Sequence, residues 1–290
     1  MCKLEALLEE AEERRNKGDH ARAVQVLDQA LEIKPLNDSL WLKKASYLLE
    51  MGRPADALAA ANRAAELRSG DAGTWFLIAL IQEQLGDRER ELAAYDNVLR
   101  INPNHVPAIL NKGAALYDLG RLEWAFKVFN DLTQRFPQEP RGWNNRGLVL
   151  KAMGRLVEAQ ASFERSSMMD PDFADPLINI ARLREERGDM EGAVEGWKDV
   201  LRLVDSRADI WAHLGTCLRG IGQLEDALTA LDRALYLEPS LELVRQERER
   251  LAAEMGLDEE EPRGDEEDPA GTAASAAAQD DVPPEERTEA

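Results

Sequence analysis

The sequence predicts an all-α solenoid of repeated helix pairs, and three observations carry this prediction. Eight glycines recur at a spacing of 34 residues, small and large residues recur at fixed distances from them, and prolines close most of the units. The chain has 290 residues, of which 44% are hydrophobic and only 6% aromatic. Such a composition, rich in alanine and leucine, favours helices packed on helices over sheets.

The glycines mark a turn inside each unit. They are Gly18, Gly52, Gly86, Gly120, Gly154, Gly188, Gly222 and Gly256. Glycine at a fixed spacing indicates a left-handed or closely packed backbone. Numbering each unit from Leu4 gives every residue a position from 1 to 34, with the glycines at position 15. The stretches before and after each glycine have helical length and apolar spacing, so each unit is predicted to form two helices.

Complementary sizes predict how the two helices pack. Position 8 is small in every unit: Ala11, Ala45, Ala79, Gly113, Gly147, Ala181 and Gly215. Position 20 is alanine in six units, and Glu91 stands there in the third, which predicts a slightly looser helix pair. Large residues prevail at position 4, which includes four tryptophans, and at position 24. These large side chains are expected to fill the space left by the small ones.

Proline stands at position 32 in five units and is expected to end each helix pair, because it cannot continue a helix. The predicted units are residues 4–37, 38–71, 72–105, 106–139, 140–173, 174–207 and 208–241. A further helix over 242–256 keeps the spacing but carries Arg245, Gln246 and Glu249 at apolar or small positions, so it is predicted to cap the solenoid. Residues 257–290 hold thirteen acidic and two basic residues, which predicts a disordered acidic tail.

Residues 143–171, WNNRGLVLKAMGRLVEAQASFERSSMMDP, carry the pattern most fully. They resemble the tetratricopeptide repeat, with Trp–Leu–Gly–Tyr in its first helix and Ala–Phe–Ala–Pro in its second. The resemblance covers residues 4–241. It implies a right-handed superhelical solenoid that acts as a scaffold or adaptor and binds an extended peptide or partner segment in its concave groove. The alternative is a structural subunit of a stable multiprotein complex that uses the convex face.

In this family, positions 2, 5, 6, 9, 12 and 13 line the groove. Position 6 is asparagine in three successive units, at Asn111, Asn145 and Asn179, with Asn144 beside them. The arrangement is similar to the asparagine ladder in the O-linked N-acetylglucosamine transferase. A carboxamide both donates and accepts, so a row of them can pair with a peptide main chain. His213 continues the row as a groove contact, and the alternative is that asparagine is a tolerated polar residue on an exposed face.

Further groove residues complete the predicted peptide-binding set: Tyr117, Arg141, Lys151, Arg182 and Arg219. Basic residues gathered on one face of an acidic chain would attract acidic or carboxylate-bearing peptides. Ordinary charge mixing is the favoured alternative, because acidic residues share this face. The acidic tail could also fold back onto these residues, although a solubilising role is the simpler expectation.

Several other partners and activities are not expected. The net charge of −20 disfavours nucleic acid and anionic membranes. Position 5 holds no lysine and position 9 no asparagine, so the family's clamp for the C-terminal carboxylate of chaperones is not predicted.

Catalytic, metal and membrane patterns are also missing from the sequence. The three histidines form no spaced pair, the two cysteines form no CxxC, and no nucleotide-binding or hydrolase motif occurs. We therefore expect no enzyme, no cofactor and no metal. No apolar run approaches the 18 or so residues of a membrane span, and the N-terminus enters an amphipathic helical pattern at once, so a soluble cytoplasmic protein is expected.

Overall fold

The computed structural model describes residues 3–257, and all of the predicted acidic tail except Leu257 lies outside the described residues. Within this range the chain forms fifteen α-helices and no strand. The helices are α1 (Lys3–Asn16), α2 (His20–Ile33), α3 (Asp38–Glu50), α4 (Pro54–Leu67), α5 (Ala72–Leu85), α6 (Arg88–Ile101), α7 (Val106–Asp118), α8 (Leu122–Arg135), α9 (Pro140–Ala152), α10 (Leu156–Met169), α11 (Ala174–Glu186), α12 (Met190–Leu201), α13 (Ala208–Gly220), α14 (Leu224–Leu237) and α15 (Glu242–Glu254).

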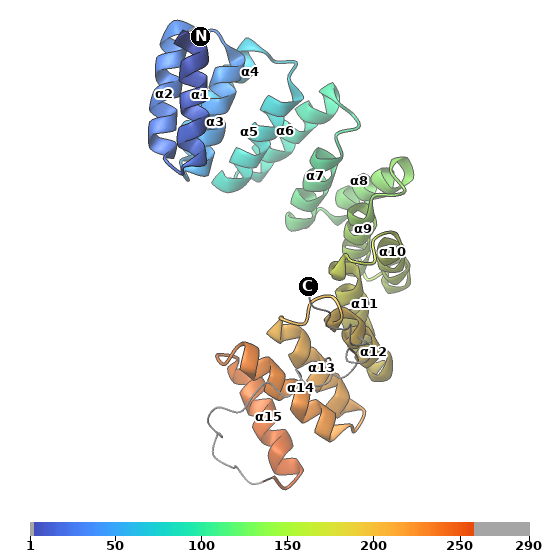
Figure 1. The fold of residues 1–290 in the computed structure, drawn as a ribbon. Coiled ribbons are helices and arrows are strands. Elements are labelled where there is room, and N and C mark those ends of the chain that lie inside the picture. Colours follow the sequence, from blue (N-terminus) through green and yellow to red (C-terminus); the bar gives the residue numbers. More distant parts are fainter. Residues whose placement is uncertain (1–2, 258–290) are drawn as a thin grey trace, which may run out of the picture.

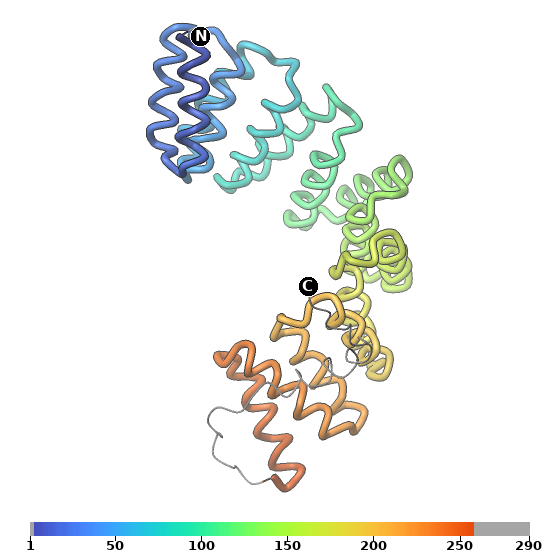
Figure 2. The backbone as a smooth tube through the Cα atoms, in the orientation of Figure 1, coloured from blue at the N-terminus to red at the C-terminus, as the bar shows by residue number. Residues whose placement is uncertain are grey.

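The helices follow one another along an open arc (Figure 1), with α1 at one end and α15 at the other. Each packs mainly on the helices that precede and follow it in the sequence. The backbone tube in Figure 2 shows the same helix–turn–helix unit repeated around the arc. The first helix of a unit lies nearer the open centre than the second, as α9 and α10 show in Figure 1. The predicted all-α superhelical solenoid is therefore confirmed.

The glycines of position 15 all take the left-handed conformation, with φ between 68° and 79°. In the first unit, the N–H of Asp19 donates to the carbonyl of Arg14 at 2.9 Å, which closes the end of α1. The side chain of Asp19 then accepts from the N–H of Arg22 at 3.3 Å and caps α2. Two adjacent residues thus end one helix and begin the next.

The size pattern at positions 8 and 24 packs as predicted. Phe129 and Phe163 are at most 1% exposed and lie against glycines of the facing helix. A Cβ added to Gly113 would lie 2.4 Å from the Phe129 ring, and one added to Gly147 would lie 2.5 Å from the Phe163 ring. Only a glycine leaves room for these rings at this helix spacing.

The tryptophans of position 4 have a role that the repeat pattern did not indicate. The indole N–H of Trp41 donates to the carbonyl of Pro35, at position 32 of the preceding unit, at 2.8 Å. The same bond recurs in Trp75 to Ser69 at 2.9 Å, Trp143 to Pro137 at 3.0 Å and Trp211 to Asp205 at 2.7 Å. Each tryptophan stays partly exposed. It therefore ties its unit to the preceding turn besides packing against it.

The looser helix pair expected at Glu91 is not seen at that residue. The Glu91 side chain is buried, with 1% of the residue exposed, and its carboxylate accepts from Arg88 Nη1 at 2.8 Å. Burial raises the pKa of the Glu91 carboxyl above its ordinary value, and the Arg88 guanidinium opposes this rise. The pair of α5 and α6 has closed around the carboxylate.

Candidate functional site

The inner side of the arc is formed where the first helices of successive units adjoin. Asn179 Nδ2 on α11 donates to Asn144 Oδ1 on α9 at 3.0 Å, which joins position 6 to position 5 of the preceding unit. Thr216 Oγ1 on α13 donates to Glu247 on α15 at 3.1 Å, which joins position 9 to position 6 of the next helix. Positions 5, 6 and 9 therefore face the seams between first helices, on the surface that the resemblance implied.

Positions 7 and 25 join successive units by a different seam. Lys44 on α3 pairs with Asp28 on α2 at 2.5 Å, and Lys112 on α7 pairs with Asp96 on α6 at the same distance. Each bond runs from the second helix of one unit to the first helix of the next. Successive units are thus joined by two separate sets of polar contacts. Only the set between first helices borders the predicted groove.

Two members of the predicted asparagine ladder are engaged within the chain. Asn111 Nδ2 donates to the Tyr95 hydroxyl at 3.1 Å, and Tyr95 is fully buried. Burial raises the pKa of Tyr95 to about 12 and leaves a hydroxyl that needs a partner. Asn179 donates to Asn144, which is only 5% exposed. The side chain of Asn145 is partly exposed and makes no hydrogen bond within residues 3–257.

These contacts predict unequal effects of alanine at the ladder positions. Replacing Asn111 should destabilise the fold by about 1–2 kcal/mol, because the Tyr95 hydroxyl loses its partner. Replacing Asn145 should cost less than about 0.5 kcal/mol, as is usual for surface sites. Urea unfolding followed by circular dichroism measures both, and equal midpoints for the two variants would contradict the structural role of Asn111.

His213 also contacts position 24 of the unit before it. Its ring stacks on Trp197 with 4.8 Å between centroids, and its Nδ1 lies 3.1 Å from Glu185 Oε2. The Trp197 indole N–H donates to the same carboxylate at 3.2 Å. Burial raises the pKa of Glu185, but the bonds from His213 and Trp197 hold it below its ordinary value. His213 therefore repeats the pattern of Asn111: in both cases a polar residue at position 6 contacts a buried aromatic residue at position 24 of the preceding unit.

Cys217 lies in the same region, fully buried among apolar side chains. Burial raises the pKa of its thiol to about 12, so the reactive thiolate is strongly disfavoured.

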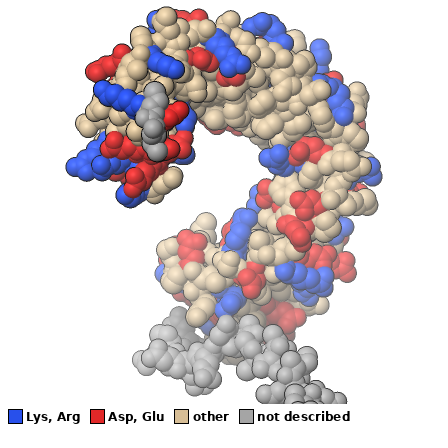
Figure 3. Space-filling model, turned by 45° about the horizontal axis from the view of Figure 1, so that its top comes forward, with Lys and Arg blue, Asp and Glu red and all other residues tan. Residues whose placement is uncertain are grey.

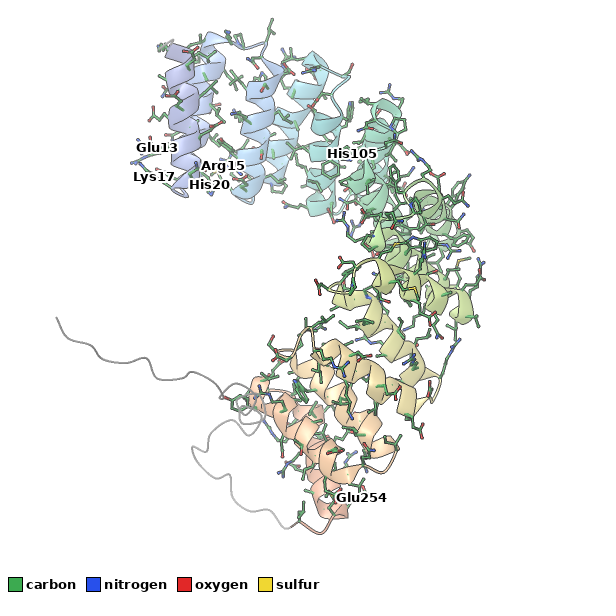
Figure 4. The ribbon with its side chains drawn as sticks, turned by 45° about the vertical axis from the view of Figure 1, so that its right-hand side comes forward. Glu13, Arg15, Lys17, His20, His105 and Glu254 are labelled. Atoms are coloured by element: carbon green, nitrogen blue, oxygen red, sulfur yellow. The ribbon has the colours of Figure 1, made fainter. Side chains whose placement is uncertain are left out.

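Two basic residues of the predicted site are paired with carboxylates on the next first helix. Lys151 Nζ on α9 lies 2.6 Å from Glu186 on α11, and Arg219 on α13 lies 2.9 Å from Glu254 on α15. Figure 4 labels Glu254 near one end of the arc and Arg15 near the other. Arg15 repeats the arrangement with Glu50 at 2.6 Å. In each case position 12 meets position 13 of the next first helix.

This pairing could have been found in the sequence, where a base at position 12 is followed 35 residues later by glutamate. Sequence reasoning took Lys151 and Arg219 one at a time and missed it. Exposed pairs of this kind contribute little stability but neutralise charge locally. The attraction for acidic peptides that was considered for this row is correspondingly reduced.

The remaining predicted residues lie on the same face without strong partners. Arg141 is exposed and pairs with the nearby Glu139 at 2.9 Å. Arg182 and Tyr117 are partly exposed, and neither side chain forms a hydrogen bond or ion pair with the described residues. Among the ten predicted residues, Asn145, Arg182 and Tyr117 thus keep polar groups available to a ligand.

No helix within residues 3–257 is both long enough and apolar enough to cross a membrane. No group of three or more His, Cys, Asp or Glu side chains in this range is arranged to hold a metal ion.

The sequence matches a family model described as tetratricopeptide repeat over residues 8–72, 42–106, 76–140 and 178–242. A second model of the same description matches residues 140–173. These matches account for most of the chain that the structure describes.

Several curated proteins are similar to parts of the chain. Human Tetratricopeptide repeat protein 7B is 30% identical over 124 residues, which is 43% of this chain and 15% of that protein. Anaphase-promoting complex subunit cut9 of Schizosaccharomyces pombe is 26% identical over 167 residues, 57% of this chain and 24% of that protein. Human Protein O-mannosyl-transferase TMTC1 is 26% identical over 172 residues, which is 58% of this chain and 20% of that protein. The chain spans about a quarter or less of the length of these relatives.

Solved structures share the architecture. A tetratricopeptide repeat protein from Parabacteroides merdae superposes with a TM-score of 0.64 at 20% identity, over 86% of this chain and 98% of that one. A chain of the anaphase-promoting complex hetero-tetramer Cut9–Hcn1 gives a TM-score of 0.59 at 15% identity, over 83% of this chain and 48% of that one. At these identities the likeness shows the fold.

Proposed function

The chain belongs to the tetratricopeptide-repeat family, and from this premise we propose that it is an adaptor that binds an extended segment of a partner protein along the inner face of its arc. Members of the family generally mediate protein–protein interaction and complex assembly. The observation that carries the proposal is the unbroken row of first helices bordering the hollow visible in Figure 3. Such a concave surface suits a chain that lies along it.

In this proposal the chain is a scaffold rather than an enzyme, and it acts in the cytoplasm. The name of TMTC1 includes a transferase activity, but the segment similar to this chain is a fifth of that protein's length. The proposed partners are proteins or peptides and not nucleic acid, since the chain carries a net charge of −20. A chaperone carboxylate is not the proposed ligand, because position 5 lacks lysine and position 9 lacks asparagine.

One observation favours a second candidate function, that of a structural subunit which packs through its outer face. Trp124 is 63% exposed at position 19, where the other units carry a charged residue or glycine. It lies between two surface cavities of about 470 and 370 Å³, both of which it lines. Exposed tryptophans beside pockets are the side chains that dominate many protein interfaces.

Site-specific photocrosslinking in native cell extract separates the two functions. A photoreactive residue is placed at Ala114 or Thr216 on first helices, and at Ala93 or Ala161 on second helices, all four being exposed. Groove binding predicts that the same partner polypeptide is captured at Ala114 or Thr216 and not at Ala93 or Ala161. Capture confined to the second helices would overturn groove binding and support the structural subunit.

A further inference from the structure

The inner face has two chemically different halves. At positions 2, 5, 6, 9, 12 and 13, units one to four carry six acidic and two basic residues, whereas units five to seven carry four of each. Large apolar side chains also concentrate in the first half, on three consecutive first helices. We call these partly exposed residues the α3–α5–α7 patch: Leu42, Leu49, Phe76, Leu77, Leu80 and Tyr117.

The seams α3–α5 and α5–α7, which lie under this patch, lack the ion pair between positions 12 and 13 that joins α1–α3, α9–α11 and α13–α15. Between α3 and α5, position 12 is Leu49 and position 13 of the next helix is Gln84. Between α9 and α11, the corresponding residues are the paired Lys151 and Glu186. From α9 to α15, polar side chains on neighbouring first helices therefore bond to one another, whereas from α3 to α7 apolar carbon lies open to a ligand.

The seam between α5 and α7 has a carboxylate at position 12, where three other seams have a base. Position 12 is Glu83, and position 13 of the next helix is Asp118. Arg88 lies 4.0 Å from Glu83 and 3.4 Å from Asp118, but its shortest contact is the 2.8 Å bond to the buried Glu91. Three carboxylates thus share one guanidinium. At the seams of Arg15, Lys151 and Arg219 one base faces one position-13 carboxylate, whereas this seam keeps a surplus of negative charge because Arg88 is shared.

Helix geometry adds to the negative potential at this edge. Positions 12 and 13 lie in the last turn of the first helices, as Glu83 does in α5 and Asp118 in α7. The free carbonyl groups at a helix C-terminus carry partial negative charge and favour a cation nearby. Both helices present this end at the same edge of the groove, next to the apolar patch.

We propose that the α3–α5–α7 patch holds an extended partner segment in which large apolar side chains are interspersed with lysine or arginine, one cation lying beside Glu83 and Asp118, whose charges Arg88 neutralises only in part. The inference rests on the proposed function, which it narrows to one half of the groove and one class of partner. Burial of the apolar side chains holds the segment, and the surplus of carboxylates selects basic over acidic segments. The side chains of an extended segment alternate in direction, so such a segment can present apolar groups to the patch and basic groups to its rim.

The test uses the full chain and three labelled twelve-residue peptides that differ in one residue type. The first repeats leucine, lysine and proline, with proline keeping it extended. The second has serine for leucine, and the third has glutamate for lysine. Fluorescence anisotropy should show saturable binding of the first peptide, with at least tenfold weaker binding of the other two. Equal binding of the lysine and glutamate peptides would overturn the charge selection, and equal binding of the serine peptide would overturn the apolar contact.

Variants locate the site. Replacing both Leu77 and Leu80 by serine should weaken the first peptide at least tenfold. The matched control replaces Val157 and Met168, which are 76% and 74% exposed on α10, by serine and should leave affinity unchanged. If the leucine variant melts early, Asp118→Lys provides an independent measurement, because the Asp118 side chain is 54% exposed. It replaces one of the surplus carboxylates by a base and should weaken the lysine peptide about tenfold.

The outcomes distinguish this inference from the proposed function. Peptide affinity that is unchanged in both the leucine variant and Asp118→Lys would overturn the inference. Capture of native partners at Ala114 or Thr216 would still support groove binding in that case. Capture of partners only at Ala93 or Ala161 would remove the proposed function, whatever the synthetic peptides do.

Discussion

Replacing Gly147 by alanine is expected to destabilise the middle of the solenoid by about 3 kcal/mol. The added Cβ would lie 2.5 Å from the Phe163 ring, which is fully buried and cannot move aside without opening the α9–α10 pair. Overpacking a filled core typically costs about 1–3 kcal/mol, and an obstructed ring lies at the upper end. Urea unfolding followed by circular dichroism should show a lower midpoint.

Two controls belong with this measurement. Adding Phe163→Leu to the alanine variant should recover much of the loss, because the chain already combines Ala11 with Leu27 at the equivalent positions of the first unit. Gly70→Ala should be nearly neutral, since a Cβ there meets nothing within 4 Å. A midpoint for Gly147→Ala equal to that of the unmodified chain would show that position 8 tolerates a larger residue.

Replacing Leu251 by aspartate is expected to detach the C-terminal cap and to cost more than about 4 kcal/mol locally. Leu251 on α15 is fully buried in the cluster that contains Ile210 and Leu231. An unpaired carboxylate cannot remain there, so α15 must leave the surface or the acid must take up a proton. Hydrogen exchange should quicken in α13–α15 and remain unchanged in α1–α6, because a solenoid transmits such effects through nearest neighbours.

The matched control is Leu243→Asp on the same helix. Leu243 is 81% exposed, so the same chemical change should leave exchange in α13–α15 as it was. If both variants behaved alike, α15 would be tolerant of charge on either face and would not act as a cap.

The sequence predicted the parts of the fold that depend on residue size and backbone conformation. The glycines of position 15 required a left-handed turn, and Phe163 required a glycine opposite it, because both constraints act at a fixed place in every unit. Hydrogen bonds that cross between units were harder to foresee. The bond from Trp41 to the Pro35 carbonyl depends on the direction of one N–H, and periodicity carries no information about that direction.

The candidate site shows the same division. Helical geometry placed Asn111 and Lys151 on the side opposite the buried one, and the family resemblance implied that this side lines the groove. Their availability to a ligand depends on other units, since Tyr95 lies 16 residues before Asn111 and Glu186 lies 35 residues after Lys151. A reading that takes one position at a time does not reveal such partners. The apolar patch on α3, α5 and α7 was not predicted, because a periodic pattern does not distinguish apolar residues that stay partly exposed from those of the core.

The distribution of ion pairs across the inner seams also predicts where the arc bends most easily. Position 12 meets position 13 as base and acid at α1–α3, α9–α11 and α13–α15. At α3–α5 and α7–α9 neither position is charged. No inner seam between α3 and α9 is joined by such an ion pair, so the arc is expected to bend most easily there. Salt screens ion pairs but not apolar contacts. Raising the ionic strength should therefore make the seams α1–α3, α9–α11 and α13–α15 easier to bend and leave α3–α9 as it was.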